Sequence, residues 1–362
     1  MKSIAVFFGG VSVEHDVAGI TGVLTCNSVS ETYRVVPVYV DGCGEWFTGD
    51  ILRDPDVYAN LDLKKLTKVT LLAGSNKLYA VRGKRLKELC AVSAAINCIH
   101  GERGEDGSLA GVLKMCGIAN ASADIYPSAL AMDKVITKRA VKGLANVLPF
   151  VVAESVKVAE NADLPFDFPV IVKPVLGGSS IGVKVAENKE ELSRAVGYAL
   201  RFGKRVIIEP CLSDFTEINC AAYKTADGVK VSECEMPVRR TEFLTFSDKY
   251  ESGKRIFPAD IPKKMSDKIK SITESVYNTF AFTGVIRIDF FVVAGKVYLN
   301  EINSVPGSLA YYLFSDTLKG FTAMIDELLE VARIEFAGES TVKKTYDSGI
   351  LRAVGAKSAK RL

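Results

Sequence analysis

The chain has 362 residues, of which 48% are hydrophobic and 25% charged, so it is long enough for two or three lobes with ordinary globular cores. A formal net charge of +3 gives no general case for nucleic-acid binding, and no stretch approaches the roughly 18–20 apolar residues of a membrane span. The opening MKSIAVFFGG is too short for a secretory signal, and eight cysteines without a Cys-x-x-Cys pair predict a cytoplasmic protein with reduced thiols.

The first part of the chain, residues 1–127, alternates strand and helix patterns. Continuous apolar runs, typical of strands buried on both faces, occur at residues 3–8, 35–40 and 95–99. Helices are expected over 17–29 and 108–117, the second with Ser108 as its N-cap, and the section 44–82 holds two short hairpin-like pieces. This alternation predicts an α/β lobe built on one open parallel sheet.

The patterning changes at residue 128, where one helix is expected over 128–146. Strands are expected at 168–174, 183–185 and 205–209, hairpins at 217–237 and 285–300, and helices at 190–202, 265–282 and 321–336. Antiparallel hairpins with helices beside them predict an α+β region. We divide it into lobes at 128–212 and 213–336, with a polar mobile loop at 240–260 and a basic tail at 337–362.

The most informative segment is the hairpin VIRIDFFVVAGKVYLNEIN at 285–303. Arg287 and Asp289 are two residues apart on one strand, and Glu301 and Asn303 are two apart on its partner, so each pair shares a face. Three oxygen ligands without His or Cys suit a hard cation such as Mg²⁺. The alternative is a solvated strand face, which the clustering of short polar residues at one end disfavours.

A glycine-rich turn, KPVLGGSSIG at 173–182, joins two expected strands. Glycines let the backbone approach a phosphate, and amide and hydroxyl groups can bind its oxygens. The chain contains no Walker A sequence and no G-x-G-x-x-G, since Gly42-Cys43-Gly44 lacks the third glycine. An ordinary hairpin turn explains this segment equally well.

Two further turns lead from an expected strand into a helix, at residues 9–15 and 100–108. Such junctions offer free N–H groups and the positive end of a helix dipole. The two histidines, His15 and His100, both lie just beyond strand ends, where ligands bind in open α/β sheets. Glu14 is either a favourable first-turn acid or an anchor for a substrate ammonium group.

These segments together resemble a known family. The sequences GGVSVEH, HGERGEDGSLAG, MDK, FPVIVKPVLGGSSIGV, RVIIEP followed by TE, DKY, VIRIDF and NEINSVPG have the order and spacing of D-alanine–D-alanine ligases, members of the ATP-grasp superfamily. The match spans residues 1–336. It implies an ATP-grasp fold of two lobes after the N-terminal lobe, and ADP-forming ligation of two D-alanines for peptidoglycan precursors. ATP and two Mg²⁺ (or Mn²⁺) ions are implied, as is a homodimer.

The resemblance also assigns roles by position. ATP contacts fall on Lys134, Lys173, Gly178, Ser179, Ser180, Glu209, Leu212, Glu217 and Lys249, and the metal ligands are Asp289, Glu301 and Asn303. Glu14 binds the ammonium of the first D-alanine, and Ser179 with Tyr250 closes the loop over it. Arg287 and the Gly307 amide stabilise the reacting carboxyl group, and the second substrate lies near His100, Tyr312 and Leu313.

The sequence departs from the family pattern on the acceptor side. Tyr312 stands where the family has a serine for the second substrate's carboxylate, and Ala110 replaces a common glutamine. Pro210 and Cys211 also differ from the frequent basic–aromatic pair on the adenine side. D-serine or D-lactate therefore remain alternatives to the second D-alanine, although Tyr250 favours an amine.

Two readings from other classes also remain. A MgATP-binding regulatory protein without ligase activity would bind nucleotide but not turn it over, and the retained charged residues argue against it. A dinucleotide-binding oxidoreductase is suggested by the α/β beginning alone and is disfavoured by the missing glycine fingerprint.

Overall fold

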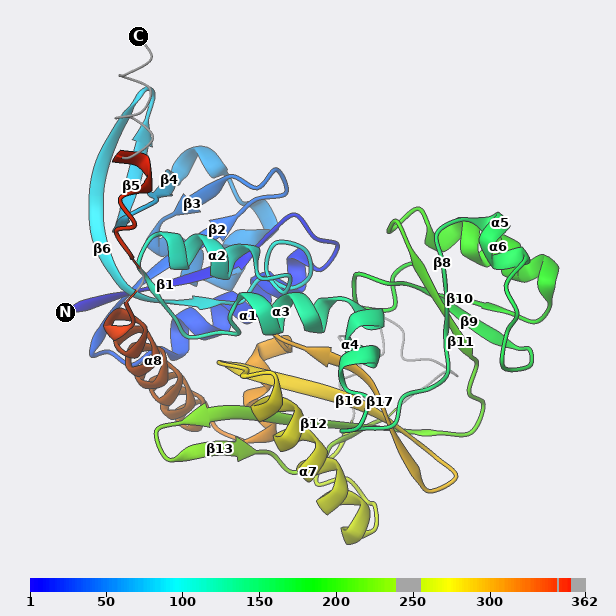
Figure 1. Cartoon of the computed structure of the whole chain (residues 1–362). Helices are drawn as coiled ribbons and strands as arrows, with labels where there is room; N and C mark the ends of the chain where they lie inside the picture. The colour runs from blue at the N-terminus through cyan, green and yellow to red at the C-terminus, as the bar shows by residue number, and fades with distance from the viewer. Residues whose placement is uncertain (239–254, 344, 353–362) are drawn as a thin grey trace.

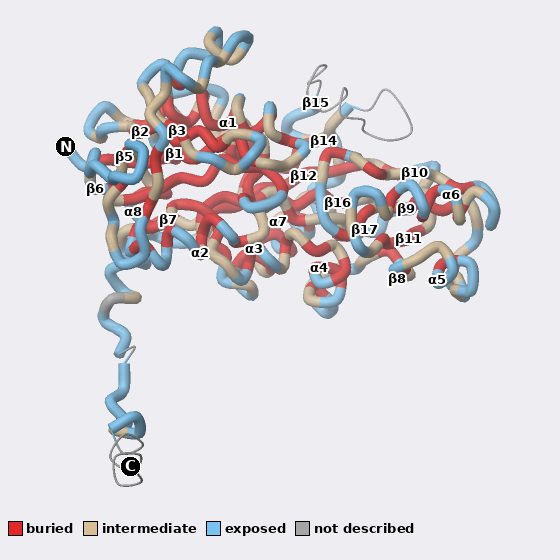
Figure 2. Tube along the Cα trace, turned by 90° about the horizontal axis from the view of Figure 1, so that it is seen from above, coloured by how far each residue is buried: buried red, intermediate tan, exposed pale blue. Residues whose placement is uncertain are grey.

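The computed structural model describes residues 1–238, 255–343 and 345–352. Figure 1 shows three lobes that follow one another along the chain: an N-terminal lobe, a small lobe set to one side, and a large lobe between them. A buried interior runs through all three lobes, as the red trace in Figure 2 shows.

The N-terminal lobe is built on a seven-stranded sheet. Its parallel part consists of β1 (Lys2–Gly9), β2 (Tyr33–Val40), the end of β6 (Arg85–Asn97) and β7 (Ala119–Asn120). Its antiparallel part consists of β3 (Trp46–Thr48), β4 (Thr67–Leu72), β5 (Ser75–Arg82) and the beginning of β6. The sheet is therefore mixed, and the expectation of one open parallel sheet is wrong in this respect. Tight turns join β4 to β5 and β5 to β6, and a connection that short allows only antiparallel neighbours.

Helices α1 (His15–Ser28) and α2 (Ser108–Met115) pack on this sheet, close to their expected positions. Ser108 is not the N-cap of α2. Gly107 occupies that position in the left-handed region, with a φ of 85°, and the Asp106 carboxylate accepts a hydrogen bond from the Ser108 N–H at 2.9 Å. The side chain of Ser108 is therefore not required to begin the helix. The remaining short 3-10 turns of this lobe are Asp50–Arg53, Pro55–Asn60 and Leu63–Lys65.

Two helices, α3 (Ile125–Met132) and α4 (Lys134–Ala140), lead from the N-terminal lobe to the small lobe. The sequence pattern predicts one helix over 128–146, so this expectation is wrong. Asp133 leaves the helical conformation with φ −93° and ψ 106°, and its carboxylate accepts hydrogen bonds from the N–H groups of Val135 and Ile136. An aspartate in this position begins a new helix rather than continuing the old one.

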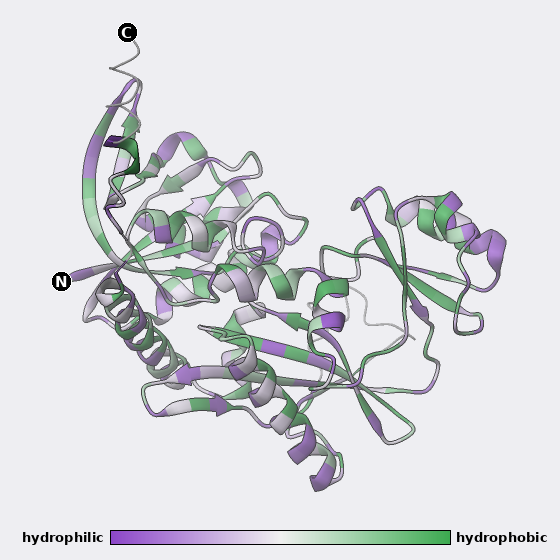
Figure 3. Ribbon diagram, viewed as in Figure 1, coloured by the Kyte–Doolittle hydropathy of each residue, from purple (hydrophilic) through white to green (hydrophobic). Residues whose placement is uncertain are grey.

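The small lobe is a four-stranded antiparallel sheet with two helices on one face (Figure 1). Its strands are β8 (Val151–Ala153), β9 (Val170–Pro174), β10 (Lys184–Ala186) and β11 (Val206–Pro210), in the order β10-β9-β11-β8. Its helices are α5 (Val156–Glu160) and α6 (Lys189–Ala199). The apolar spacing of α6 places Leu192, Ala195, Val196 and Ala199 in the core, and Figure 3 shows the hydrophilic residues that alternate with them.

The large lobe carries a second antiparallel sheet, in the order β13-β12-β16-β17. Its strands are β12 (Thr216–Thr225), β13 (Gly228–Val231), β16 (Val285–Val293) and β17 (Lys296–Asn303). Helices α7 (Lys263–Thr279) and α8 (Leu318–Thr341) both pack against β12. A small ribbon joins β14 (Met236–Pro237) to β15 (Arg255–Ile256), and a short turn, η5 (Gly307–Leu313), follows β17.

Helix α8 ties the large lobe to the N-terminal lobe, because one continuous core contains its residues and those of β1 and β6. After α8 the described part of the tail is exposed and extends away from the lobes (Figure 2). Within residues 1–238, 255–343 and 345–352, no helix is long and apolar enough to cross a membrane.

Candidate active site

One face of the β16–β17 ribbon gathers the polar residues that the spacing places there. Arg287 lies opposite Asn303, and Asp289 lies opposite Glu301. Residues directly opposite in an antiparallel pair project on the same side. The other face carries Ile286, Ile288, Phe290, Val297 and Leu299, all buried in the core of the large lobe. The ribbon therefore has one apolar face and one charged face.

A β-bulge interrupts this ribbon beside the charged residues. Phe290 pairs with Leu299 and Asp289 with Glu301, so Asn300 is an extra residue on β17. Asn300 and Glu301 both line a cavity of about 330 Å³ between the small and large lobes. Bulges commonly re-aim side chains next to binding sites, and here two neighbouring polar residues are directed to one cavity.

That cavity has both apolar and polar lining residues. Its apolar lining includes Leu148, Ile171, Leu176, Ile181, Val183, Val185, Leu212, Phe215 and Phe291. Its polar lining includes Lys134, Lys173, Ser179, Ser180, Lys184, Glu217, Asn300 and Glu301. A pocket lined by apolar side chains with a smaller number of polar groups is the usual character of a small-molecule or cofactor site.

The glycine-rich turn closes one side of this cavity. Ser179 and Ser180 both have positive φ angles, 53° and 58°, which non-glycine residues adopt rarely. The Lys134 ammonium donates a hydrogen bond to the Gly177 carbonyl, which ties α4 to the turn. Burial and the neighbouring Lys173 lower the pKa of Lys134, and acids including Glu301 partly offset this. The turn therefore joins two lysines that face one cavity.

Glu209 lies behind the cavity wall rather than on it. Its carboxylate is fully buried and forms ion pairs with Lys138 at 2.8 Å and with Lys173 at 3.0 Å. Burial alone would raise its pKa, but the two ammonium groups hold the pKa at about 2. Of the three residues only Lys173 lines the cavity, so the assignment of Glu209 to adenine stays a prediction.

Glu14 connects the N-terminal lobe to the glycine-rich turn. Its buried carboxylate accepts a hydrogen bond from the Ser179 hydroxyl, across 165 positions of sequence. A Cβ added at Gly178 would lie 3.1 Å from the Glu14 Oε2 atom, and one at Gly101 would lie 3.2 Å from it. Backbone from two lobes therefore approaches this carboxylate closely, which glycine permits.

Arg287 and Asp289 form a bidentate ion pair. The Nε atom of Arg287 donates to Asp289 at 2.7 Å and its NH2 group donates at 2.9 Å. Its NH1 group donates to the Tyr312 hydroxyl at 3.3 Å. Burial tends to lower the pKa of Arg287, but the Asp289 charge outweighs it and holds that pKa above its usual value. The guanidinium therefore stays charged and fixed in plane.

His100 is fully buried in a hydrogen-bonded chain. Its Nε2 atom lies 3.0 Å from the Thr21 hydroxyl, which accepts a hydrogen bond from the Ser308 N–H at 3.0 Å. Burial lowers the pKa of His100 to about 4, so the ring is neutral near pH 7. These hydrogen bonds fix the start of the turn that carries Tyr312.

That turn, Gly307–Leu313, has an unusual backbone. Ser308, Leu309 and Ala310 have φ angles of 51°, 50° and 48°, three consecutive left-handed residues without a glycine. Each such residue costs roughly 1–2 kcal/mol relative to the right-handed conformation. Contacts at both ends of the turn have to hold it in place.

The remaining predicted residues have the following positions. Leu212 and Glu217 line the cavity, Gly307 begins the left-handed turn, and Leu313 is buried at its end. Ala110 is buried in α2. Lys249 and Tyr250, with most of the expected loop at 240–260, lie outside the described residues.

Sequence reasoning missed several residues around the site. Glu105 is half-buried, and its carboxylate accepts hydrogen bonds from the N–H groups of Gly101 at 2.8 Å and Val305 at 3.0 Å. Burial and the charge of Glu14 raise its pKa to about 8. Lys138 was missed as well, although it lies one helical turn after Lys134 on α4, and that spacing was the available signal.

Comparison with known proteins places this geometry in a family. A model of the "D-ala D-ala ligase N-terminus" matches residues 3–122, and one of the "D-ala D-ala ligase C-terminus" matches residues 145–330. The chain belongs to the D-alanine–D-alanine ligase family. The family resemblance inferred from the sequence motifs is confirmed.

Members of this family are similar to the chain over nearly its whole length. The D-alanine–D-alanine ligase of Thermosipho melanesiensis is 33% identical over 97% of this chain and 99% of its own. That of Helicobacter pylori strain P12 is 34% identical over 94% of this chain and 96% of its own. These relatives therefore align with all three lobes.

Solved structures of family members have the same fold. The Helicobacter pylori D-alanine–D-alanine ligase superposes with a TM-score of 0.78 at 29% identity, covering 91% of this chain and 98% of its own. A D-Ala:D-Ser ligase from Enterococcus faecalis superposes with a TM-score of 0.77 at 24% identity, covering 91% and 99%. Enzymes named for different acceptors thus share this fold, so the fold does not select the acceptor.

Proposed function

We propose that the protein joins two D-alanines to D-alanyl-D-alanine with hydrolysis of ATP to ADP and phosphate, for peptidoglycan precursor synthesis. The observation that carries this proposal is the junction of Glu14, Ser179 and the cavity. An acid suited to a substrate ammonium lies beside a glycine-rich turn that also borders a nucleotide-sized pocket. The family, whose curated members are named for this reaction, supports the same activity.

ATP would lie in the cavity between the small and large lobes. Its apolar wall, including Ile171 and Phe291, suits an adenine ring, and Glu217 lines the same cavity at a position suited to the ribose. Lys134 and Lys173, which line the same cavity, would bind the phosphates. Gly178, Ser179 and Ser180 would contribute backbone and hydroxyl donors to the phosphate oxygens.

The oxygen ligands on the ribbon fit Mg²⁺ or Mn²⁺. Asp289 and Glu301 are paired across the strands, and Asn303 is two residues beyond Glu301 on the same face. These are hard oxygen donors without a competing soft ligand. The described residues contain no group of three or more His, Cys, Asp or Glu side chains that could hold a metal, which agrees with a set that includes an asparagine. Bound metal would supply positive charge to the ATP phosphates.

The first step would form an acyl phosphate. The carboxylate of the first D-alanine has to approach the terminal phosphate of ATP, and two unit charges about 4 Å apart repel by about 4 kcal/mol at an effective dielectric near 20. Lys134 and Lys173 oppose this repulsion from the cavity wall. Glu14 would hold the ammonium of the same substrate and so orient its carboxylate towards the phosphate.

The second step would be attack of an amine on the acyl phosphate. This attack creates a tetrahedral oxyanion, which the Arg287 guanidinium and the Gly307 N–H would stabilise. His100, neutral because burial depresses its pKa, would lie beside the incoming amine. Lys249 and Tyr250 would act from the loop at 240–260, as the sequence resemblance implies.

The identity of the acceptor, the second substrate, is the most specific part of this proposal. Tyr312 contacts Arg287 through its hydroxyl, where a shorter serine would leave space for the acceptor carboxylate. Transfer to D-serine or D-lactate is the alternative, and the D-Ala:D-Ser ligase structure keeps D-serine open. Homodimer formation and a cytoplasmic location stay predictions.

The test is product analysis. Purified protein with MgATP receives D-alanine, L-alanine, D-serine and D-lactate singly and in pairs, and phosphate release and product masses are measured. Dipeptide and phosphate from D-alanine alone are the expected result. Nucleotide binding without turnover by any pair would overturn the ligase proposal, and turnover only with a second compound would identify another acceptor.

A further inference from the structure

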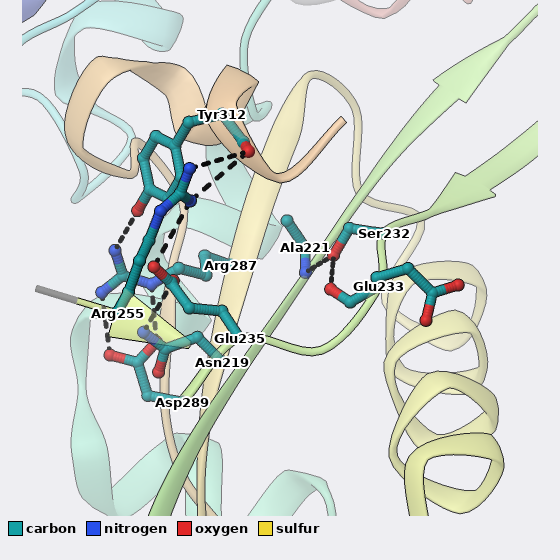
Figure 4. Close-up of polar contacts among 9 residues, drawn as sticks. All are labelled: Asn219, Ala221, Ser232, Glu233, Glu235, Arg255, Arg287, Asp289 and Tyr312. Atoms are coloured by element: carbon teal, nitrogen blue, oxygen red, sulfur yellow. Dashed lines mark hydrogen bonds and ion pairs between the residues drawn. The ribbon is translucent and has the colours of Figure 1, made fainter. Parts of the chain in front are cut away.

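A chain of six polar residues surrounds the base of the left-handed turn (Figure 4). Its members come from β12, the position before β14, β15, β16 and the turn itself, in the order Asp289, Arg287, Tyr312, Arg255, Glu235 and Asn219. Asn219 is the register partner of Asp289 on the neighbouring strand, so the two ends of this chain of contacts lie side by side in the sheet. We call these six residues the polar ring.

Tyr312 lies between Arg287 and Arg255, the two arginines of the polar ring. Its hydroxyl accepts a hydrogen bond from Arg287 at 3.3 Å, and the Arg255 guanidinium lies 4.6 Å above its ring centroid. Both terminal nitrogens of Arg255 also lie 3.4 Å from the Tyr312 carbonyl oxygen, to which they donate. One arginine thus fixes the ring face and backbone, and the other fixes the hydroxyl (Figure 4).

Arg255 is itself held in place. Its guanidinium forms an ion pair with Glu235 at 3.5 Å and lies 5.2 Å from the Phe257 ring centroid. The Glu235 side chain is only 6% exposed, and its second oxygen accepts from the Asn219 amide at 3.4 Å. Although Arg255 is itself exposed, its guanidinium contacts a buried acid and two aromatic rings, so its orientation is determined by its surroundings.

The turn that carries Tyr312 requires such support. Its three left-handed residues are unfavourable alone, and at one end the Thr21 hydroxyl accepts the Ser308 N–H. At the other end the Tyr312 carbonyl accepts from Arg255. Removing one of two anchors leaves an unfavourable backbone free to relax.

We propose that Arg255 is a positioning residue for the acceptor side of the active site, which fixes the Tyr312 ring against Arg287 and so excludes acceptors larger than D-alanine. This inference rests on the proposed ligase function. Tyr312 occupies the position that the resemblance gives to the contact with the acceptor carboxylate. A tyrosine ring held at one face by Arg255 and at its hydroxyl by Arg287 forms a rigid wall there, whereas a ring released by Arg255 could turn aside and admit a longer side chain. Donor selection depends on Glu14 and Ser179, which lie outside the polar ring.

The test uses the dipeptide itself to separate the two substrates. Wild type, Arg255→Ala and Arg255→Lys receive MgATP with equal D-alanine and D-norvaline. Tandem mass spectrometry then measures norvaline at the N-terminal (donor) and C-terminal (acceptor) positions. Arg255→Ala is expected to raise the norvaline-to-alanine ratio at the acceptor position about tenfold, which is about 1.4 kcal/mol of lost discrimination. The donor ratio should stay within twofold.

Two variants control for general damage. Arg255→Lys keeps the charge beside Glu235 but loses the planar fork, so it should restore part of the acceptor selectivity. Arg194→Ala removes an arginine that is 73% exposed on α6 and should match wild type. Melting temperatures show that each variant is folded.

Three results would overturn the inference. One is an unchanged acceptor ratio in folded Arg255→Ala, and another is an equal change in the donor and acceptor ratios. The third is a fall in total product with both ratios constant, which is the behaviour of a merely structural residue. Absence of any dipeptide from wild type would instead overturn the proposed function itself, so the two failures are distinguishable.

Discussion

The Ser179 hydroxyl donates a hydrogen bond to the Glu14 carboxylate, and this contact joins the small lobe to the N-terminal lobe. Neither residue is in a helix or strand, since Glu14 precedes α1 and Ser179 lies in the glycine-rich turn. A substrate ammonium bound to Glu14 would therefore sit where both lobes meet. We therefore expect donor binding to be coupled to the position of the small lobe.

Replacing Glu14 tests that coupling. Glu14→Gln removes the charge while keeping the shape, and hydrogen bonds to charged groups contribute about 1.5–3 kcal/mol. We expect the donor KM to rise roughly 10–100-fold, with the Kd for MgATP little changed. Steady-state kinetics and nucleotide titration measure the two quantities. Glu31→Gln, at an exposed acid, is the control, and an equal loss of nucleotide affinity would contradict the assignment.

The Arg287–Asp289 pair has separable roles in stability and activity. Arg287→Met leaves the Asp289 carboxylate, 1% exposed, without its partner, so unfolding should become easier by about 3–5 kcal/mol. Adding Asp289→Asn should recover much of that stability, because the unpaired charge is gone, while activity stays at least 100-fold reduced. Denaturant titration and phosphate release measure the two effects. A double variant no more stable than Arg287→Met would show that the pair is not coupled.

The buried ion pairs of Glu209 should contribute more to the free energy of unfolding than an exposed ion pair does. Glu209→Gln leaves Lys138, whose side chain is 1% exposed, without a counter-charge, and we expect a loss of about 3–5 kcal/mol in the free energy of unfolding. Asp267→Asn breaks the exposed pair between Lys263 and Asp267 on α7 and should change that energy by less than about 1 kcal/mol. Urea unfolding compares them, and similar losses would refute the argument from burial.

The free energy of unfolding should decrease as the pH falls, because His100 stays neutral in the folded protein. The pKa of this group is about 4 in the folded protein against an ordinary 6.5, so between these values the unfolded chain binds a proton that the folded chain excludes. Its contribution is fully present above pH 6.5 and is lost as the pH falls to 4, by as much as about 3 kcal/mol. His100→Gln lacks this term. The wild-type advantage over the variant should therefore shrink across that window in unfolding titrations, and a constant difference would count against it.

The sequence patterns predict the β16–β17 ribbon well. Its two determinants, the alternation of side chains along each strand and the turn between the strands, both depend on residues close together in the sequence. Alternation along β16 and β17 sets the faces, and Ala294 and Gly295, with positive φ angles, form the turn of the hairpin that was expected over 285–300. The helices α6 and α7 were also predicted within a few residues, since their apolar spacing is regular.

Pairing between distant strands was harder to predict. The 13-residue β6 pairs with β5 over its first half and β1 over its second, and nothing in its own sequence names those partners. The break at Asp133 was missed because no proline or glycine marks it. Arg255 was missed because its partners Glu235 and Tyr312 are brought to it only by the fold.

The bulge at Asn300 adds a residue that faces the cavity without changing which residues of the hairpin face the core. Leu299 and Ile302 face the core on either side of it, and Asn300 and Glu301 both face the cavity. If Asn300 were deleted, Leu299, Glu301, Ile302 and Asn303 would still alternate in and out. Position 300 is therefore dispensable for the hydrophobic core, and length variation there would reshape the nucleotide pocket without turning any later side chain over.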